Sequence, residues 1–351
     1  MKHSFSKNKS IPKFFQRYEE RINFALRKEY EKLHGNIYDT HKYYMGWTDE
    51  NGKKINAIGG KRLRPNLVLL GAEAADGDIE LAIPFAVAIE LIHNFSLIHD
   101  DIEDMDELRH HRATLWKLWG IPGAIISGNA MLKIADLATN KNIKIKEKIK
   151  LEASHILSSR YLTMMEGQFL DIDFESKLEI TIDEYLDMIQ RKTGALIEAS
   201  LHIGAIVGQK NLSMNDQKIE SIKIIGKEFG KIFQIKDDML GIWGDEKTGK
   251  PVGADIIKKK KSLPILHAIN YAKGSNKKQI KNLFIKKRNL HNEEIKIILR
   301  IMEELRTSEY CENLLNSTWE NCYQEIISSN INEKIKLELI ELGKFLLTRN
   351  V

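Results

Sequence analysis

The stretch IELAIPFAVAIELIHNFSLI occupies residues 79–98 and is followed, after His99, by the acidic stretch DDIED at residues 100–104. The first stretch is apolar on almost every face of a helix, although Glu90 and His93 interrupt it. A helix that is apolar all round is buried by its neighbours, so this segment predicts the central helix of a helical bundle. Carboxylates that follow a buried helix repel one another and are costly to bury without partners, so they predict a functional site.

The rest of the chain carries the same periodicity. Apolar residues recur at helical spacing over Phe14–Leu33, Leu63–Ala75, Ile79–Asp106, Ile121–Leu137, Ile145–Asp173, Ile182–Val207, Asp216–Trp243 and Leu263–Tyr271, and in three or four later segments up to Leu347. Proline, which breaks helices, is absent between Gly123 and Lys250. Strand-like alternation is scarce, so the predicted fold class is all-α.

The chain is predicted to form a single domain. Its 351 residues include 42% apolar and 29% charged ones, which exclude disorder as the main state and suffice for a sizeable core. We expect residues 1–58 to form an N-terminal helix and loop, residues 59–264 a core that bears the motifs, and residues 265–351 peripheral helices. Within the first part, Gly35–Gly60 is rich in turn-forming residues and predicts a loop or a small hairpin.

Composition also limits where the chain works and what it binds. No run of 18 apolar residues is free of charges, so no integral membrane segment is expected, and the N-terminus lacks the apolar core of a secretory signal. We interpret Cys311 and Cys322 as reduced thiols, which favours a cytoplasmic protein. The net charge of +5 is small, and the basic runs at 258–261 and 286–288 lack interleaved aromatic residues, so no nucleic acid partner is expected.

The acidic stretch predicts a metal site. Asp100 and Asp104 lie about one helical turn apart and share a face, with Asp101 beside them. A similar phrase, an aromatic residue followed by two adjacent aspartates, recurs as FQIKDD at residues 233–238. Mg²⁺ takes one or two carboxylates and completes its shell with water and phosphate oxygens. Two such pairs favour a Mg²⁺ site over the alternative of two solvated helix ends.

Single basic residues accompany the acids. GGKRLRP at residues 59–65 places Lys61 and Arg64 on one face of a helix start, after two glycines that allow a phosphate to approach the backbone. Further cations follow at Arg109, Arg112, Lys192, Lys250 and residues 258–261. Taken alone, the stretch at 59–65 is also consistent with a helix start that is simply basic, but acid clusters with scattered cations predict a site for a metal-bound diphosphate.

Together the motifs resemble those of the trans-isoprenyl diphosphate synthases. The set comprises GGKRLRP at 59–65, DDxxD at 100–104, GQxxD at 167–171, Lys192-Thr193 and FQxxDD at 233–238, in that order. The resemblance implies an isoprenoid-synthase helical bundle around a central cavity. It also implies a prenyltransferase, usually a homodimer, that condenses isopentenyl diphosphate with an allylic diphosphate.

The resemblance implies a role for each matching residue. Three Mg²⁺ ions would bind the allylic diphosphate through Asp100, Asp104 and Asp237, supported by Asp101 and Asp238. The same diphosphate would contact Arg109, Lys192, Lys250 and Lys260, whereas Lys61, Arg64 and His93 would bind isopentenyl diphosphate. Lys192, Thr193 and Gln234 would turn oxygen dipoles toward an allylic carbocation.

Two positions depart from the family pattern. His110 stands where a second arginine is expected, and a histidine is only partly charged at neutral pH, so either Arg112 compensates or binding of isopentenyl diphosphate is weaker. Gly241 stands where the second cluster would carry its fifth-position aspartate. A weakly active or non-catalytic partner subunit therefore stays an alternative. A terpene cyclase is less favoured, because cyclases need no second diphosphate site.

Product length is predicted from the helix before Asp100. Ser96 lies about 6 Å before Asp100 on nearly the same face and is small, whereas Phe95 and the deeper Ile92 and Ile89 are bulky. In the family, an aromatic residue followed by a small one at these positions resembles geranylgeranyl (C20) diphosphate synthases. C20 is the expected product, and C15 and C25 stay open.

Overall fold

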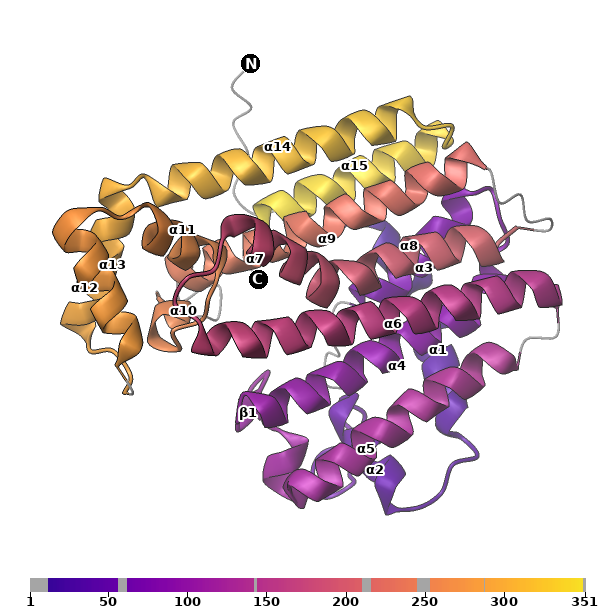
Figure 1. Ribbon diagram of the computed structural model, residues 1–351. Helices are drawn as coiled ribbons and strands as arrows, with labels where there is room; N and C mark the ends of the chain where they lie inside the picture. The colour runs from indigo at the N-terminus through magenta and orange to yellow at the C-terminus, as the bar shows by residue number, and fades with distance from the viewer. Residues whose placement is uncertain are drawn as a thin grey trace. The chain divides into compact units, whose positions relative to one another are not determined.

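The computed structural model describes residues 12–55, 62–141, 144–209, 216–244, 253–286 and 288–349 (Figure 1). Over these residues nearly all regular structure is helical, so the predicted all-α fold class is confirmed. The α-helices are α1 (Phe14–Tyr30), α2 (Asn36–Tyr44), α3 (Leu63–Ala74), α4 (Ile79–Glu103), α5 (Leu115–Asn140), α6 (Glu147–Ser176), α7 (Ile182–Ile189), α8 (Ala195–Val207), α9 (Gln217–Trp243), α10 (Ala254–Ile257), α11 (Leu263–Tyr271), α12 (Gly274–Ile285), α13 (Asn292–Glu304), α14 (Thr307–Ser328) and α15 (Glu333–Thr348). A π-helix, η1 (Gln190–Gly194), and two short strands, β1 (Leu108–Arg109) and β2 (Arg112–Ala113), complete the described elements.

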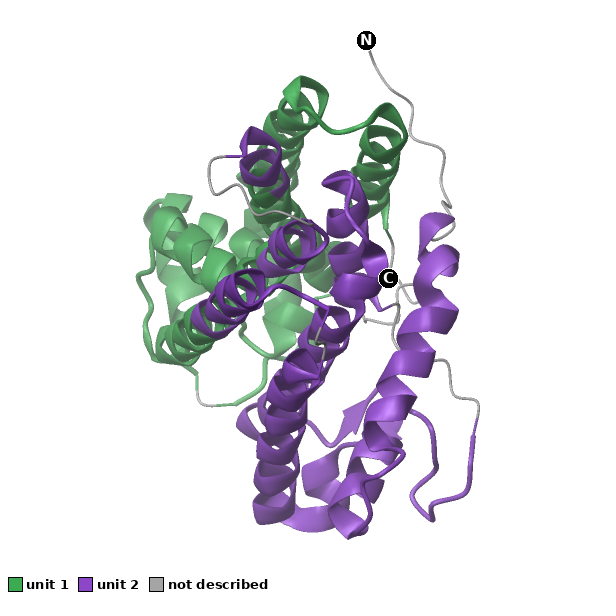
Figure 2. Cartoon of the chain, turned by 90° about the vertical axis from the view of Figure 1, so that its right-hand side faces the viewer, with its two compact units in different colours: residues 1–12, 160–198, 223–351 green, residues 13–159, 199–222 purple. Residues whose placement is uncertain are grey.

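The chain divides into two compact units, which Figure 2 shows in different colours. Unit 1 comprises residues 1–12, 160–198 and 223–351, and unit 2 comprises residues 13–159 and 199–222. We describe each unit by itself. The single domain, with its predicted boundaries after residues 58 and 264, stays a prediction.

The predicted central helix lies at the core of unit 2. α4 begins after Asp78, whose side chain accepts a hydrogen bond of 2.9 Å from the Glu80 N–H and caps the helix. Most side chains between Ala82 and Ile98 are buried, and α3 and α5 pack along the helix. By length and composition α4 alone among the described helices would suffice to cross a membrane, but 67% of its most apolar window is buried inside the protein.

The prediction of a loop over Gly35–Gly60 is wrong in its first part, because residues 36–44 form helix α2. Thr40 and His41 are buried, and both bond to Ser127 of α5. The Thr40 Oγ1 lies 2.6 Å from the Ser127 Oγ, and the His41 Nε2 lies 2.9 Å from the Ser127 carbonyl oxygen. Polar residues that are typical of a loop thus serve as packing contacts, and tertiary structure overrides their weak local preference.

Two short β features lie in unit 2. An isolated bridge between Thr48 and Lys54 closes a turn over Asn51 and Gly52, within the tract predicted as a loop or a small hairpin. A hairpin of β1 and β2, which the sequence pattern did not predict, follows α4 and pairs Leu108 with Ala113. Strands of two residues are too short to produce a visible alternation in the sequence.

Unit 1 contains the later helices. α14 and α15 run side by side (Figure 1), and α11 packs against α7, α12, α13 and α14. An apolar core joins the end of α9 to α10, α11, α12 and α13 through buried residues such as Ile242, Ile265 and Ile298. α12 and α13 therefore share their core with the end of α9, the helix that carries the second acidic motif.

Acid should destabilise unit 2 through His41. This side chain is fully buried, and burial lowers its pKa to about 4 against the opposing effect of the Ser127 carbonyl. Because the pKa of an unfolded histidine is about 6.5, the neutral side chain stabilises the fold above that pH, and the contribution is lost as pH falls from 6.5 toward 4. Between pH 7 and pH 5 we expect the free energy of unfolding to fall by about 2 kcal/mol more in the natural chain than in His41→Gln.

Chemical denaturation at the two pH values measures this difference. His34→Gln, which removes an exposed histidine, is the matched control and should keep the pH dependence of the natural chain. Equal slopes for the natural chain and His41→Gln would contradict the expectation.

Candidate active site

The first acidic cluster lies at the carboxyl end of α4 in unit 2. Asp101 is only 1% exposed, and its carboxylate accepts hydrogen bonds from the Arg109 Nε at 2.6 Å and from the Tyr44 hydroxyl at 3.3 Å. Burial raises the pKa of Asp101, and the Arg109 guanidinium opposes this shift. Asp100 is half-buried and Asp104 is exposed. The first and last aspartates of the motif are therefore the ones that reach solvent.

The predicted ligands of isopentenyl diphosphate lie near the start of α3. Arg64 Nη1 lies 3.0 Å from His93 Nε2, and Lys61 lies outside the described residues. Burial, together with the charges of Arg64, Arg109 and Arg62, lowers the pKa of His93 well below its usual value. Arginine can only donate, so the His93 Nε2 accepts this bond. His93 therefore faces its surroundings as a neutral imidazole rather than as a cation.

A buried ion pair fixes the turn before α3. Arg62 has a left-handed backbone, with φ of 51°, and pairs with Glu90 of α4; the two side chains are 9% and 6% exposed. The Asn94 Nδ2 donates to the same carboxylate at 3.1 Å. Glu90, which interrupts the apolar stretch in the sequence, thus holds the basic turn against α4, and removing one partner would leave an uncompensated buried charge.

The arginines and histidines after the first cluster form the β1–β2 hairpin. Arg109 pairs with Arg112 across it, and His110 and His111 form its turn with φ values of 50° and 62°. A two-residue turn with both φ values positive matches the twist of a hairpin. Partial burial and the nearby Arg109 and His111 lower the pKa of His110, so this side chain adds no full charge at neutral pH.

The Arg112 side chain is held by two backbone carbonyl groups and does not take the place of an arginine at position 110. The Arg112 Nη1 and Nη2 donate to the carbonyl oxygens of Tyr43 and Thr48, both at 2.8 Å. Its guanidinium also stacks on the Tyr43 ring, 4.0 Å from the ring centroid. A substrate role for Arg112 in place of an arginine at 110 would therefore require both bonds to break.

The second acidic cluster, in unit 1, resembles the first in its burial and hydrogen bonding. Asp238 is 1% exposed and accepts hydrogen bonds from the Tyr185 hydroxyl, from the Gln234 Nε2 at 2.9 Å and from the Leu263 N–H at 2.8 Å. Burial has the largest effect on the pKa of Asp238 and raises it to about 6. Each cluster thus has one fully buried aspartate that accepts a hydrogen bond from a tyrosine.

Asp237, the first aspartate of this cluster, is half-buried. Its Oδ1 lies 3.5 Å from the Nη2 of Arg349, close to the end of the chain. Arg349 stacks on the Phe233 ring at 4.0 Å and donates to the Phe233 carbonyl at 3.0 Å. The aspartate that reaches toward solvent therefore has a cation fixed beside it.

Lys192 and Thr193 lie in the π-helix η1 between α7 and α8. π-turns are rare and occur often at functional sites. Gly167 of α6 permits the close approach of η1, because a Cβ at this position would lie 2.2 Å from the backbone nitrogen of Lys192. The Lys192 Nζ donates to Asp171 at 2.5 Å, and the Thr193 hydroxyl donates to the Gln234 Oε1 at 2.8 Å. The Gln234 amide oxygen is therefore directed at Thr193.

A pocket in unit 1 brings these side chains together. Its lining comprises Asp171, Tyr185, Met188, Ile189, Lys192, Thr193, Gln234, Asp238, Lys260 and Lys261. Five of the residues predicted from the sequence meet there, namely Lys192, Thr193, Gln234, Asp238 and Lys260. Lys250, the other cation predicted for this region, lies outside the described residues.

Lys260 is the cation that faces most of the acids of the pocket. Burial alone would lower its pKa, but the carboxylates of Asp238, Asp255, Asp171 and Asp237 outweigh this effect and raise the pKa. The ammonium therefore keeps its charge. The charged Lys260 ammonium can therefore also donate hydrogen bonds to an incoming diphosphate.

The exposed and half-buried carboxylates of the two clusters fit a hard divalent cation. Asp100, Asp104 and Asp237 offer oxygen ligands, and Mg²⁺ prefers a few carboxylates with water and phosphate oxygens. Within the described ranges, no three Asp, Glu, His or Cys side chains gather to hold a metal by themselves. Carboxylate donors of this kind suit Mg²⁺ whose shell is completed by water and phosphate oxygens. The two clusters belong to different units, and their approach to each other stays a prediction.

Comparisons with known proteins agree on one family. The polyprenyl synthetase family profile matches residues 46–302. The chain is 39% identical over 253 residues to a (2E,6E)-farnesyl diphosphate synthase of Mycobacterium tuberculosis, with 70% of this chain and 67% of that protein covered. It is also 39% identical over 264 residues to a short chain isoprenyl diphosphate synthase of Methanocaldococcus jannaschii, with coverages of 73% and 78%. The chain belongs to the polyprenyl synthetase family.

Solved structures support this membership. A geranylgeranyl pyrophosphate synthetase from Pyrococcus horikoshii is 32% identical, with a TM-score of 0.83 and coverages of 96% of this chain and 98% of that chain. A polyprenyl synthetase from Streptomyces coelicolor is 28% identical, with a TM-score of 0.87 and coverages of 96% and 100%. This polyprenyl synthetase is accordingly an enzyme, a trans-prenyltransferase.

The sequence did not single out several residues of this prenyltransferase site. Tyr44 and Tyr185 bond the buried aspartates, and Arg349 pairs with Asp237. A tyrosine in a helical stretch carries no local mark of such a role, because its partner lies more than fifty positions away. Asp171 is different, since it belongs to the GQxxD motif and that motif marked it.

Removing the Tyr185 hydroxyl should shift the pH dependence of the prenyltransferase. In Tyr185→Phe, Asp238 loses one of its three hydrogen-bond donors, so its pKa rises above about 6 and less of it is ionised at pH 7. A hydrogen bond to a charged group contributes about 1.5–3 kcal/mol, so we expect activity at pH 7 to fall roughly tenfold or more. The acid limb of the pH–rate profile should move to higher pH.

Tyr271→Phe, at a tyrosine that is 52% exposed in the same unit, is the control and should leave the profile unchanged. A Tyr185→Phe enzyme with lower activity but the natural acid limb would show that the hydroxyl does not act through Asp238.

Proposed function

We propose that this prenyltransferase condenses isopentenyl diphosphate with an allylic diphosphate and releases a short-chain trans-prenyl diphosphate, geranylgeranyl diphosphate (C20). The observation that carries the proposal is the pocket at η1, where Lys192 and Lys260 stand among carboxylates such as Asp171 and Asp238. Mixed charges of this kind suit a metal-bound diphosphate. Relatives named as farnesyl, geranylgeranyl and short-chain isoprenyl diphosphate synthases support the same substrate class.

Stabilisation of the leaving diphosphate is the main task of the proposed site. Bound Mg²⁺, for which we propose three ions at Asp100, Asp104 and Asp237, would supply charge neutralisation of the diphosphate oxygens. Lys192 and Lys260, with Arg109 and Lys250 as further candidates, would place positive charge on the same oxygens. Asp101 and Asp238 would support these three aspartates from buried positions.

Ionisation would break the C–O bond, and its electron pair would leave with the diphosphate. The double bond of isopentenyl diphosphate, held by Lys61, Arg64 and the neutral His93, would then attack the allylic cation and form the new C–C bond. The proton lost from the adduct would pass to the released diphosphate. The Thr193–Gln234 pair would present oxygen dipoles near the cation, and no side-chain nucleophile is needed.

The packing of α4 supports the C20 product. Phe95 is 3% exposed and packs on His99, with ring centroids 4.6 Å apart. A Cβ at Gly128 of α5 would lie 3.3 Å from the Phe95 ring, so this ring has little room to move. Ser96, beside it, is half-buried and donates to the His93 carbonyl at 2.8 Å. A fixed aromatic residue beside a small one would stop the growing chain, and C15 and C25 are the alternatives.

We also propose that the enzyme works as a homodimer in the cytoplasm. α5 presents exposed apolar side chains, among them Trp119 at 38%, Ile125 at 40% and Ile126 at 59%. A second copy would cover such a face. Cys311 and Cys322 are both buried free thiols, which suits a reducing compartment.

The condensation assay tests the proposed function. With Mg²⁺, labelled isopentenyl diphosphate and C5, C10 or C15 allylic diphosphates in separate reactions, we expect a chelator-sensitive product of C20. Asp100→Ala should lower the rate by about a thousandfold or more, because removal of a charge that acts only in the transition state lowers kcat directly. Asp39→Ala, at a surface carboxylate that is 59% exposed, is the matched control.

Products of C15 or C25 would agree with the proposed condensation reaction but contradict the assignment of Phe95 as the residue that limits chain length. A folded chain that condenses none of the three starters would contradict the proposed function itself.

A non-catalytic or weakly active partner subunit is the second candidate, and the hairpin favours it. His110 lacks a full charge and Arg112 is engaged by two carbonyls. If this weakens the site, His110→Arg should lower the KM for isopentenyl diphosphate roughly tenfold, the value of one charged phosphate contact. An unchanged KM would show that the natural site is complete, so the measurement separates the two candidates.

A further inference from the structure

A histidine ring of α4 fills the space above a glycine of α5 in unit 2. A Cβ built on Gly128 would lie 2.6 Å from the Nε2 and 2.7 Å from the Cδ2 of His99. The same Cβ would lie 3.3 Å from the Phe95 ring. Non-bonded carbon atoms pack best at about 3.5–4.0 Å, so a side chain at position 128 and the two rings cannot share this space without a shift.

The two rings also contact each other. Phe95 and His99 lie one helical turn apart on α4, and their ring centroids are 4.6 Å apart. Phe95 is 3% exposed, so its ring lies inside the packed interior of the unit. Because a close-packed interior transmits strain, a displacement of the His99 ring is passed on to the Phe95 ring.

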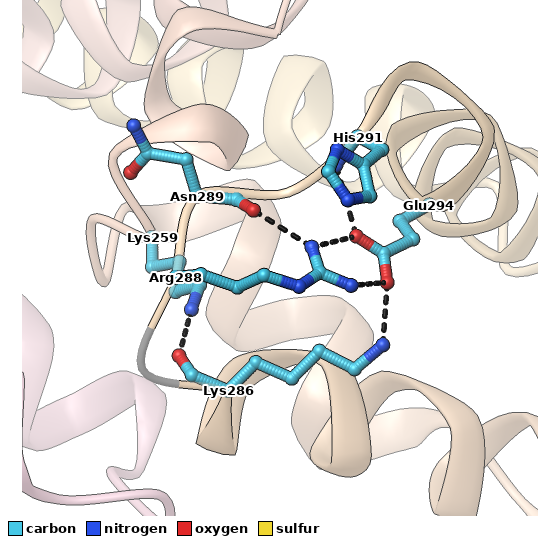
Figure 3. Close-up of polar contacts among 6 residues, drawn as sticks. All are labelled: Lys259, Lys286, Arg288, Asn289, His291 and Glu294. Carbon is cyan, nitrogen blue, oxygen red and sulfur yellow. Dashed lines mark hydrogen bonds and ion pairs between the residues drawn. The ribbon is translucent and has the colours of Figure 1, made fainter.

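Packing holds the side of the His99 ring that faces α5. The His99 Nε2 is buried and has no hydrogen-bond partner among the residues that the structure describes. His291 of unit 1 is held differently, because its N–H donates to the Glu294 carboxylate at 2.9 Å and its side chain accepts from the Glu294 N–H (Figure 3). The position of the His99 ring therefore depends on the space that Gly128 leaves open.

The α5 backbone is bonded to α2 at the same level. The Ser127 Oγ lies 2.6 Å from the Thr40 Oγ1, and the Ser127 carbonyl oxygen lies 2.9 Å from the His41 Nε2. All three side chains are buried. A methyl group added at position 128 would therefore displace the rings of α4, whose torsions are softer than a helix that is bonded at this point.

We propose that Gly128 and His99 are positioning residues for product length, because together they set where the Phe95 ring stands. This inference rests on the proposed function, in which Phe95 stops the growing chain, and deepens it by assigning the limit to α5 as well as to α4. A methyl group at 128 would push the Phe95 ring away from α5 and into the path of the chain. Loss of the imidazole would let the ring turn back.

Product sizes and the binding of prenyl probes test this inference. The natural enzyme, Gly128→Ala, His99→Ala and the double variant are incubated with Mg²⁺, isopentenyl diphosphate and a C5 allylic diphosphate, and the dephosphorylated products are sized. Titration calorimetry in Mg²⁺ uses the S-thiolodiphosphates of geranyl (C10) and geranylgeranyl (C20) alcohols. It measures binding without turnover, because the C–S bond of these probes resists ionisation.

Gly128→Ala should shorten the main product by one C5 unit. One methyl group in an apolar pocket changes affinity about tenfold or more, so we expect binding of the C20 probe to weaken about tenfold and binding of the C10 probe to stay within about twofold. A general loss of stability would not produce a loss that is selective for the longer probe.

His99→Ala should act in the opposite direction. It leaves a space beside Phe95 into which the ring can relax, so the main product should be one C5 unit longer than that of the natural enzyme. In the double variant the methyl group at 128 takes part of the space of the imidazole. The natural product length should therefore return, since the effects of neighbouring substitutions are coupled.

Gly123→Ala and His155→Ala are the matched controls. A Cβ at Gly123, which also lies in α5, would be 3.2 Å from the Trp119 Cβ, and His155 is exposed on α6. Both variants should keep the natural product and both affinities. Melting temperatures identify variants that fail to fold, and His99→Ala tests the inference should Gly128→Ala fail.

The natural product and probe affinities in folded Gly128→Ala and His99→Ala enzymes would overturn the inference and leave the proposed function intact. A folded Gly128→Ala enzyme with a longer product would overturn it too. If the natural chain condenses no substrate but Gly128→Ala selectively loses affinity for the C20 probe, the proposed function fails and the role of Gly128 stands. A natural chain that binds neither probe would contradict both.

Discussion

Burial of carboxylates beside other carboxylates is the constraint on which the rest of this enzyme depends. Asp101 and Asp238 are each 1% exposed and each follows another aspartate in the chain. A buried charge without partners costs several kcal/mol or more, so a fold that contains two of them needs donors fixed in advance. Tyr44 with Arg109, and Tyr185 with Gln234 and Leu263, are those donors. They come from α2, the hairpin, α7 and α11, so the acids tie these elements to α4 and α9.

The burial of Asp101 and Asp238 also distinguishes aspartates that stabilise the fold from aspartates that can bind a ligand. The buried aspartate of each pair has its oxygens directed at internal donors, and its neighbour, Asp100 or Asp237, is half-buried. The same residue type in adjacent positions thus takes two roles because a helix turns by about 100° per residue and points them into different surroundings. Under the proposed function, a diphosphate that carries metal ions would meet the half-buried members, while the buried ones keep the helix ends in place.

The parts predicted from the sequence are those whose cause is local. Apolar periodicity predicted both ends of α11 and the start of α4 to the residue, since a buried helix face appears directly in the spacing of apolar side chains. α2 was missed because the partner of Thr40 and His41 is Ser127, more than eighty residues away. The same reason hides Tyr44 and Tyr185, whose roles arise from residues that only the fold brings near. The aspartate motifs were found because their own spacing carries the chemistry.

Two ion pairs, one in each unit, differ in how deeply they are buried, and this difference bears on how a ligand binds. Arg62 and Glu90 are 9% and 6% exposed, so breaking their pair would strand a buried charge. Lys192 and Asp171 are 27% and 21% exposed, and a pair at such a position contributes little to stability because water screens it. Under the proposed function, a diphosphate with its metal ions would replace the Lys192–Asp171 contact at small cost, with the ammonium turning to phosphate and the carboxylate to the cation. Binding would then be an exchange of partners within unit 1, where the buried Asp238 keeps its own donors. Groups that stay in place can stabilise charge without reorganisation when the C–O bond breaks.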